Sequence, residues 1–179
     1  MGARLALVAL AAGAISLSRR AAAEPSEAEL KAEVVERFVR FVDWDPRDLP
    51  DDVEFEVCVI GESAMTQPLR NIAKKRKLRG RRAVVTVLDK IEQVVDCHLV
   101  MIAGGDRKRL RSVISRTDGR PILTIAEASG AADQGAIINL FVQDNHIRFE
   151  VNALAAKDSG LKVRAKLLRA AARVVRGKD

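Results

Sequence analysis

The 179-residue chain carries a formal net charge of +7, and 48% of its residues are apolar against 31% charged. This balance predicts a globular protein rather than a disordered one, and the length is sufficient for one domain with its own core. Aromatic residues make up only 3%, with one Trp and no Tyr, which argues against a stacking platform for single-stranded nucleic acid.

The first 23 residues predict a secretory signal peptide. Arg4 precedes an apolar run from Leu5 to Leu17, and Ala21-Ala22-Ala23 matches a cleavage site after Ala23. The run is shorter than the roughly 20 apolar residues that a membrane span needs. Arg19 and Arg20 fit a signal less well, so an uncleaved amphipathic anchor is the alternative. Because the segment holds three arginines and no acidic residue, its removal lowers the net charge from +7 to +4.

Residues 26–44 predict an amphipathic helix that packs one face onto a sheet. Ser26 and Glu29 match a capping box, and apolar side chains then recur at helical spacing. The helix is expected to end near Trp44, because Pro46 forbids its continuation. We interpret Trp44 as a core or loop anchor rather than as a partner-binding hot spot.

Short apolar runs then alternate with helical segments. The predicted strands are residues 55–60, 83–88, 97–103 and 121–126. Residues 136–142 and 147–151 predict a hairpin, and a closing helix from about Leu161 carries an apolar stripe at Leu161, Ala165, Leu168, Ala172 and Val175. The predicted fold is α/β, a three-layer α/β/α sandwich with a mostly parallel sheet, a C-terminal β-hairpin and a closing helix, in a single domain over residues 24–179.

Ordered blocks of strand hydrophobics and turn glycines span nearly all of residues 24–179. They are Lys31-Ala32 leading to Phe38, then residues 41–44, 57–61, 80–81, 97–102, 121–125, 135–140, 148–152 and 160–163, with Leu167-Leu168. Together they resemble the YfiR-like family of exported bacterial proteins. Two positions depart from the family pattern: Asp45 separates Trp44 from Pro46, and Gln134 stands where a glycine is common.

The resemblance implies a periplasmic protein with a layered α/β/α fold that tends to dimerise. It also implies a partner, the periplasmic sensory domain of a membrane-bound signalling protein, and a role, repression of a diguanylate cyclase. Nucleic acid is not an expected partner behind an export signal. The alternative function is an exported small-ligand-binding domain, with its cleft at the carboxyl ends of the parallel strands.

Cys58 and Cys97 are the two cysteines of the chain. Cys58 lies within the first predicted strand and Cys97 opens the third, so a parallel sheet brings them together if these strands are neighbours. In an oxidising compartment they predict a disulfide, and two buried thiols are the alternative. Both positions correspond to cysteines in the family blocks, and a redox switch is a further hypothesis.

Residues 74–82 form the densest charge run, with seven basic residues in nine. Six of them are candidates for contact with an acidic partner or with anionic lipid head groups: Lys74, Lys75, Arg76, Lys77, Arg79 and Arg81. The alternative is a solvated loop between a helix and a strand. The closing helix is also basic, and it either packs on the sheet or lies on a membrane surface.

The sequence offers no convincing catalytic, metal or cofactor site, so we expect no enzyme. His98 and His146 are the only histidines, and adjacent Cys97 and His98 would point to opposite faces of a strand. Gly61-Glu62-Ser63 marks a strand-to-helix junction, which is either an anion site at the helix start or a capped structural turn.

Overall fold

The computed structural model describes residues 24–177, so the predicted signal peptide, residues 1–23, lies outside the described region. The helices are α1 (Glu27–Arg40), α2 (Thr66–Lys75), the short 3₁₀ helix η1 (Ile91–Asp96), α3 (Arg107–Thr117), α4 (Ala153–Asp158) and α5 (Ala165–Ala170). The strands are β1 (Val42–Asp43), β2 (Phe55–Ile60), β3 (Ala83–Leu88), β4 (Leu99–Ile102), β5 (Leu123–Ala126), β6 (Ile138–Gln143), β7 (His146–Asn152), β8 (Lys162–Val163) and β9 (Arg173–Val175).

Seven of the strands form one sheet in the order β3-β2-β4-β5-β6-β7-β9. Strands β3, β2, β4, β5 and β6 run parallel, β7 returns antiparallel to β6, and β9 is parallel to β7. Strands β1 and β8 pair separately from this sheet. The mostly parallel sheet with a C-terminal hairpin is therefore confirmed.

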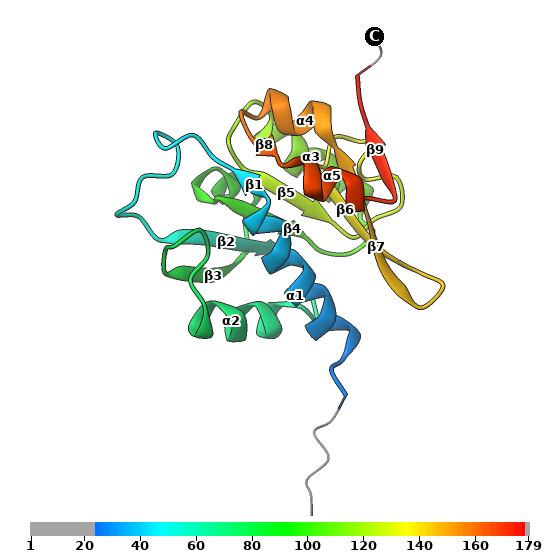
Figure 1. Cartoon of the computed structure of the whole chain (residues 1–179), viewed down its shortest axis with the longest axis horizontal. Coiled ribbons are helices and arrows are strands. Elements are labelled where there is room, and N and C mark those ends of the chain that lie inside the picture. Colours follow the sequence, from blue (N-terminus) through cyan, green and yellow to red (C-terminus); the bar gives the residue numbers. More distant parts are fainter. Residues whose placement is uncertain (1–23, 178–179) are drawn as a thin grey trace, which may run out of the picture.

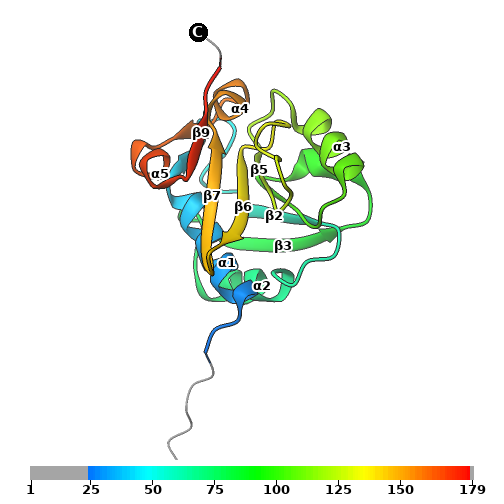
Figure 2. The same cartoon turned by 90° about the vertical axis from the view of Figure 1, so that its right-hand side faces the viewer.

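Helices cover both faces of the sheet and make three layers (Figure 1, Figure 2). Strand β2 illustrates the cause, because its successive side chains enter opposite cores. Val57 and Val59 pack in the core beneath α1 and α2, whereas Cys58 and Ile60 pack in the core beneath η1 and α3. A strand buried on both faces has no polar alternation, which explains its nearly continuous apolar sequence.

Helix α1 begins as the capping box predicts. The backbone N–H of Ser26 donates to Glu29 Oε2 at 2.8 Å, and the Glu29 N–H donates to Ser26 Oγ at 3.3 Å. The helix ends at Arg40, however, and not near Trp44. Val42 and the residue after it pair with β8 instead, so tertiary pairing takes over before the prolines are reached.

Trp44 anchors the chain after α1, as the sequence interpretation expected. Its side chain is 7% exposed, and Nε1 donates to the backbone oxygen of Pro121 at 2.8 Å. Its ring meets Phe55 edge-on with centroids 5.4 Å apart. A buried indole needs an acceptor for its N–H, and this contact supplies one.

The predicted closing helix is confirmed as α5, but it is much shorter than the apolar stripe from Leu161 to Val175 indicated. The segment forms β8, the six-residue α5 and then β9, which adds to the outer edge of β7. Val174 pairs with Val151, and Arg173 pairs with Glu150. The apolar spacing matched a helix. The segment instead gains backbone hydrogen bonds from the open edge of the sheet, and a helical periodicity in the sequence carries no information about such pairing. A long basic helix lying on a membrane is therefore not formed here.

Candidate functional site

The basic segment, residues 74–82, comprises the end of α2 and a tight turn leading into β3. Backbone hydrogen bonds of 2.9 Å join Leu78 and Arg81 in both directions. Between them, Arg79 and Gly80 have positive φ angles of 50° and 79°. This is the geometry of a two-residue turn that favours glycine at its second position, so the run is an ordered turn rather than a loose loop.

Arg81 is committed to the fold. Its guanidinium donates to the backbone oxygens of Leu49, Pro50 and Arg79 at 2.6–2.8 Å and to the Asp51 carboxylate at 2.8 Å. The side chain is only 10% exposed. Rather than presenting charge to a partner, Arg81 fixes the loop between β1 and β2.

Two other arginines of the segment also bond within the protein. Arg76 meets Glu33 at 2.6 Å, which ties α2 to α1, and Arg79 meets Asp43 at 3.0 Å. Asp43 also accepts two hydrogen bonds from Arg164, and these bonds, with the charge of Arg79, hold the pKa of its carboxyl below the usual value.

Lys74, Lys75 and Lys77 behave differently. All three are exposed, and none forms an ion pair within residues 24–177. The structure thus divides the six predicted contact residues into three arginines that hold the fold and three lysines that face solvent.

The basic segment leads directly into β3, the outermost strand at one end of the sheet (Figure 1). The N–H of Phe55 donates to the oxygen of Arg82 at 2.8 Å, and Phe55 is level with Ala83. Since hydrogen-bonding direction alternates along a parallel strand, residues 84, 86 and 88 bond to β2 while residues 83, 85 and 87 point their N–H and C=O groups outward. Val87 is also 42% exposed, so β3 offers an open backbone edge.

A disulfide joins Cys58 and Cys97, with their Cα atoms 6.0 Å apart. Strands β2 and β4 are neighbours, and Cys97 lies just before β4, at the end of η1. Both residues are buried at 3–4% exposure in the core beneath η1 and α3. Of the two sequence alternatives, the structure has the disulfide.

His98 points away from the disulfide, as strand alternation predicts. Its Nδ1 accepts the N–H of Glu56 at 3.0 Å, and its ring stacks on Phe55 with centroids 5.4 Å apart. Burial and, secondarily, the charge of Arg81 lower the pKa of His98. His98 is therefore a neutral, structural histidine.

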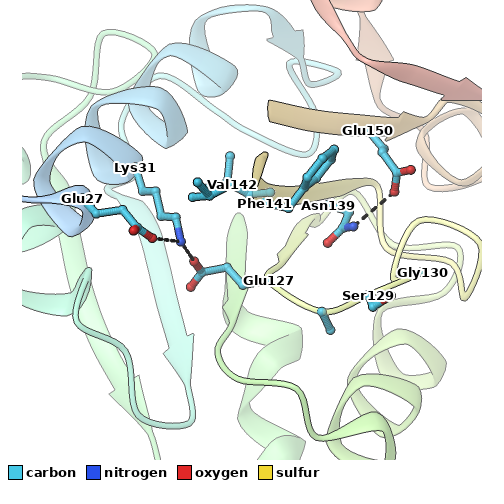
Figure 3. Close-up of a pocket in the computed structure, with 11 residues that line it drawn as sticks. Glu27, Lys31, Glu127, Ser129, Gly130, Asn139, Phe141, Val142 and Glu150 are labelled. Carbon is cyan, nitrogen blue, oxygen red and sulfur yellow. Dashed lines mark hydrogen bonds and ion pairs between the residues drawn. The ribbon is translucent and has the colours of Figure 1, made fainter. Parts of the chain in front are cut away.

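A cavity of about 510 Å³ lies between α1, the loop after β5 and the β6–β7 hairpin (Figure 3). Sequence reasoning did not identify it. Its polar lining comes from Glu27 and Lys31 on α1, Ser129 in the loop, and the residues Glu127, Asn139 and Glu150. Its apolar wall comes from Leu140, Phe141 and Val142. These residues are far apart in sequence, so only the fold brings them together.

Lys31 and Glu127 close one side of this cavity (Figure 3). Lys31 Nζ lies 2.6 Å from Glu27 and 2.8 Å from Glu127, and its side chain is 14% exposed. Burial acts to lower the pKa of Lys31, but the hydrogen bonds to Glu127 and Glu27 outweigh it and raise that pKa. The ammonium is thus charged and already holds two carboxylates.

Asn139 lies at the floor of the cavity with one amide atom unpaired. Its Nδ2 donates to Glu150 Oε2 at 3.1 Å, whereas its Oδ1 has no hydrogen-bond partner among the described residues. The residue is 4% exposed. Figure 3 shows Oδ1 directed away from Glu150, toward the side of the cavity formed by Glu127 and Ser129. Asn139, a polar residue inside an apolar strand, is the one sequence signal from which this cavity could have been predicted.

The predicted cleft at the carboxyl ends of the strands also exists. A crevice of about 870 Å³ lies at the carboxyl end of β2. Here β3 lies on one side of β2 and β4 on the other, so the order in which strands are added to the sheet reverses at this point. Asp106 already accepts the first free amides of α3, at Lys108 and Arg109. Arg109 itself donates to the oxygen of Ala103 at 3.1 Å.

Gly61-Glu62-Ser63 borders the same crevice and forms a structural turn. Ser63 Oγ accepts the N–H of Met65 at 3.1 Å, and Gly61 has a φ of 89°. The positive φ favours glycine at this position, and a Cβ there would also displace the flexible end of Arg109, whose Nη1 would lie 2.7 Å away. Ser63 therefore stabilises the turn before α2, whereas α2 itself begins after Met65, which provides no side-chain cap.

Within the described part of the chain, no three or more His, Cys, Asp or Glu side chains lie close enough together to hold a metal ion. A helix with the length and apolarity to span a membrane is likewise not found between residues 24 and 177.

A family model described as YfiR/HmsC-like matches residues 28–172 of the chain. Among curated proteins no match is found. The matched residues include nearly all of the described helices and strands.

Solved structures show the same kind of fold at low identity. A conserved domain protein from Vibrio cholerae is 11% identical, with a TM-score of 0.53 over 83% of this chain and 60% of its own. The ABC domain in complex with L-Trp from Streptococcus pneumoniae is 9% identical, with a TM-score of 0.52 over 78% of this chain and 61% of its own. The chain thus spans about three fifths of the length of each, and the likeness is one of fold.

Proposed function

Because the chain belongs to the YfiR/HmsC-like family, we propose that it is a periplasmic protein that binds and represses the sensory domain of a membrane-bound diguanylate cyclase. The family is periplasmic and regulates diguanylate cyclase signalling, and membership over residues 28–172 is the observation that carries the proposal. In this proposal residues 1–23 direct export and are cleaved after Ala23, and the mature chain acts by binding rather than by catalysis.

The open edge of β3 and the lysines beside it form the proposed docking surface. The outward N–H and C=O groups of residues 83, 85 and 87 can hydrogen-bond an added strand. Lys74, Lys75 and Lys77 carry charge that no carboxylate within residues 24–177 neutralises. Charge complementarity therefore selects an extended, acidic segment of the sensory domain as the occupant.

Two sets of variants test the surface in a pull-down from detergent-solubilised membranes, with the full-length chain exported and its disulfide intact. Val87→Pro removes an outward N–H without removing a bond to β2, so the fold should be retained while cyclase capture falls. Reversal of the lysines (K74E/K75E/K77E) should weaken capture about tenfold or more and reduce its salt dependence.

Matched controls make the outcome decisive. Val53→Pro changes another exposed valine in a loop, and R107E/K108E/R111E reverses three exposed charges on α3, across the sheet. Both should leave capture unchanged. If all four variants capture the cyclase as well as the wild type does, this docking surface is rejected. If the wild type recovers no membrane signalling protein, the proposed function itself is rejected.

The proposal also includes a homodimer, which the family resemblance implies, and peripheral contact of the three lysines with anionic lipid. Analytical ultracentrifugation should give twice the mass of the mature chain. In co-sedimentation, vesicles containing phosphatidylglycerol should carry the wild type into the pellet and leave K74E/K75E/K77E in the supernatant. Neutral vesicles are the control.

A further inference from the structure

The cavity between α1 and the β6–β7 hairpin combines a buried, unpaired acceptor with excess negative charge. Asn139 Oδ1 is the acceptor, and the cavity is lined by three carboxylates against one ammonium. A buried carbonyl oxygen without a donor costs roughly 1–3 kcal/mol, so a group that supplies an N–H there is stabilised. We infer that this cavity binds a small organic ammonium ion, with its amine donating to Asn139 Oδ1.

The charges of the lining favour a cation over an anion. Lys31 is the one basic residue of the lining, and Glu27 and Glu127 already hold its Nζ within 2.8 Å. A carboxylate ligand would have to displace one of these partners, whereas an ammonium enters beside Glu127 without breaking an existing bond. The Glu150 carboxylate is held by Arg173, which keeps the pKa of Glu150 low but also offsets its charge, so the excess negative charge comes from Glu27 and Glu127 against Lys31.

The apolar wall indicates what the rest of the ligand is. Phe141 is half-buried and Val142 is 42% exposed, and both line the cavity. An ammonium on a short aromatic or branched aliphatic body would place its cation at Asn139 and Glu127 and its body on these side chains. The volume of about 510 Å³ is in the range of small-molecule sites.

The test compares benzylamine with phenylacetate, which carry the same ring and opposite charges. Ligand-observed NMR and calorimetry on the full-length chain, purified as the cell processes it, should detect benzylamine and not phenylacetate. The side-chain amide signals of Asn139 should shift during the benzylamine titration, because the amine bonds to the same amide group.

Two variants separate binding from folding. Asn139→Leu removes the acceptor, and Glu127→Gln removes a charge while keeping a hydrogen-bond acceptor for Lys31. Each should weaken benzylamine binding about tenfold or more, which corresponds to the loss of one charge-assisted hydrogen bond. Glu62→Gln, which borders the separate crevice, is the matched control and should change nothing.

Equal binding of both ligands, unchanged affinity in Asn139→Leu, or no binding of benzylamine together with a more stable Asn139→Leu variant would overturn the inference. The last result would mean that Asn139 Oδ1 is an unsatisfied acceptor that no ligand fills. These measurements need no membrane partner, so their failure is distinguishable from failure of the proposed regulatory function.

Discussion

Single residues of the basic segment differ in what their side chains can reach. Arg81 spreads its planar group over three backbone oxygens and a carboxylate, whereas Lys77 is exposed and forms no ion pair with the described residues. Five N–H donors in a fixed plane suit several acceptors at once, and a lysine ammonium does not. The sequence identified the charge of both residues but not this division, because three of the four acceptors lie in residues 49–51, about 30 residues away in a loop without regular structure.

Arg81→Ala should lower the free energy of unfolding by about 2–3 kcal/mol, because it leaves the oxygens of Leu49 and Pro50 without their donor. Arg81→Lys should recover only part of this loss. Lys77→Ala, the control, should stay within about 0.5 kcal/mol of the wild type. Urea unfolding measures all three, and equal effects at both positions would contradict the structural role of Arg81.

His98 should make stability depend on pH in a defined direction. Its pKa is lowered in the folded protein by burial first and by the charge of Arg81 second, so the unfolded chain binds the proton more readily. The contribution of His98 is therefore complete above its ordinary pKa of about 6.5 and is lost as the pH falls from there through the folded pKa.

His98→Asn keeps an acceptor for the Glu56 N–H but cannot titrate in this range. Its urea midpoint should fall less than that of the wild type between neutral and mildly acidic pH. Parallel midpoints across this window would show that the folded pKa of His98 is not lowered. The exposed His146→Asn is the matched control for loss of a histidine.

At the scale of elements, local patterns predicted most helices and strands, but they did not show where a segment would pair with a distant strand. The capping box of α1 and the apolar strands followed from neighbouring residues, whose positions local geometry fixes. The C-terminal segment had a helical stripe, yet residues 173–175 became β9 because β7 offered an open edge. The cavity at Asn139 was missed for the same reason, since its lining comes from four separate segments.

Arg173 is the residue that ties β9 to its neighbours. It bonds Glu150 at 2.7 Å and Asp133 through two hydrogen bonds of 2.7–2.8 Å, and those bonds lower the pKa of both carboxyls. Arg173→Ala should therefore release β9 and reduce hydrogen-exchange protection at Val151, which pairs with β9. Arg176→Ala, close by in sequence, should not. Unchanged protection in Arg173→Ala would show that backbone pairing alone holds β9.

At the scale of the whole molecule, the disulfide links the first parallel strand to the start of the third across a sequence separation of 39 residues. Closing a loop of that length restricts the unfolded chain and stabilises the fold by about 4 kcal/mol in the chain-entropy model. The predicted strands suggested that Cys58 and Cys97 could form a disulfide. The bond requires β2 to lie beside β4 in the sheet, and the order of the strands along the chain does not fix that.

Replacement of both cysteines by alanine should lower the free energy of unfolding by about 4 kcal/mol, chiefly through the unfolded state. Reduction of the wild type should give a similar loss, and the double variant should be insensitive to reductant. If the disulfide only supports the fold, the double variant should still capture its membrane partner below its unfolding temperature. Loss of capture by the folded double variant would instead establish a redox switch, because partner binding would then depend on the bond and not merely on stability.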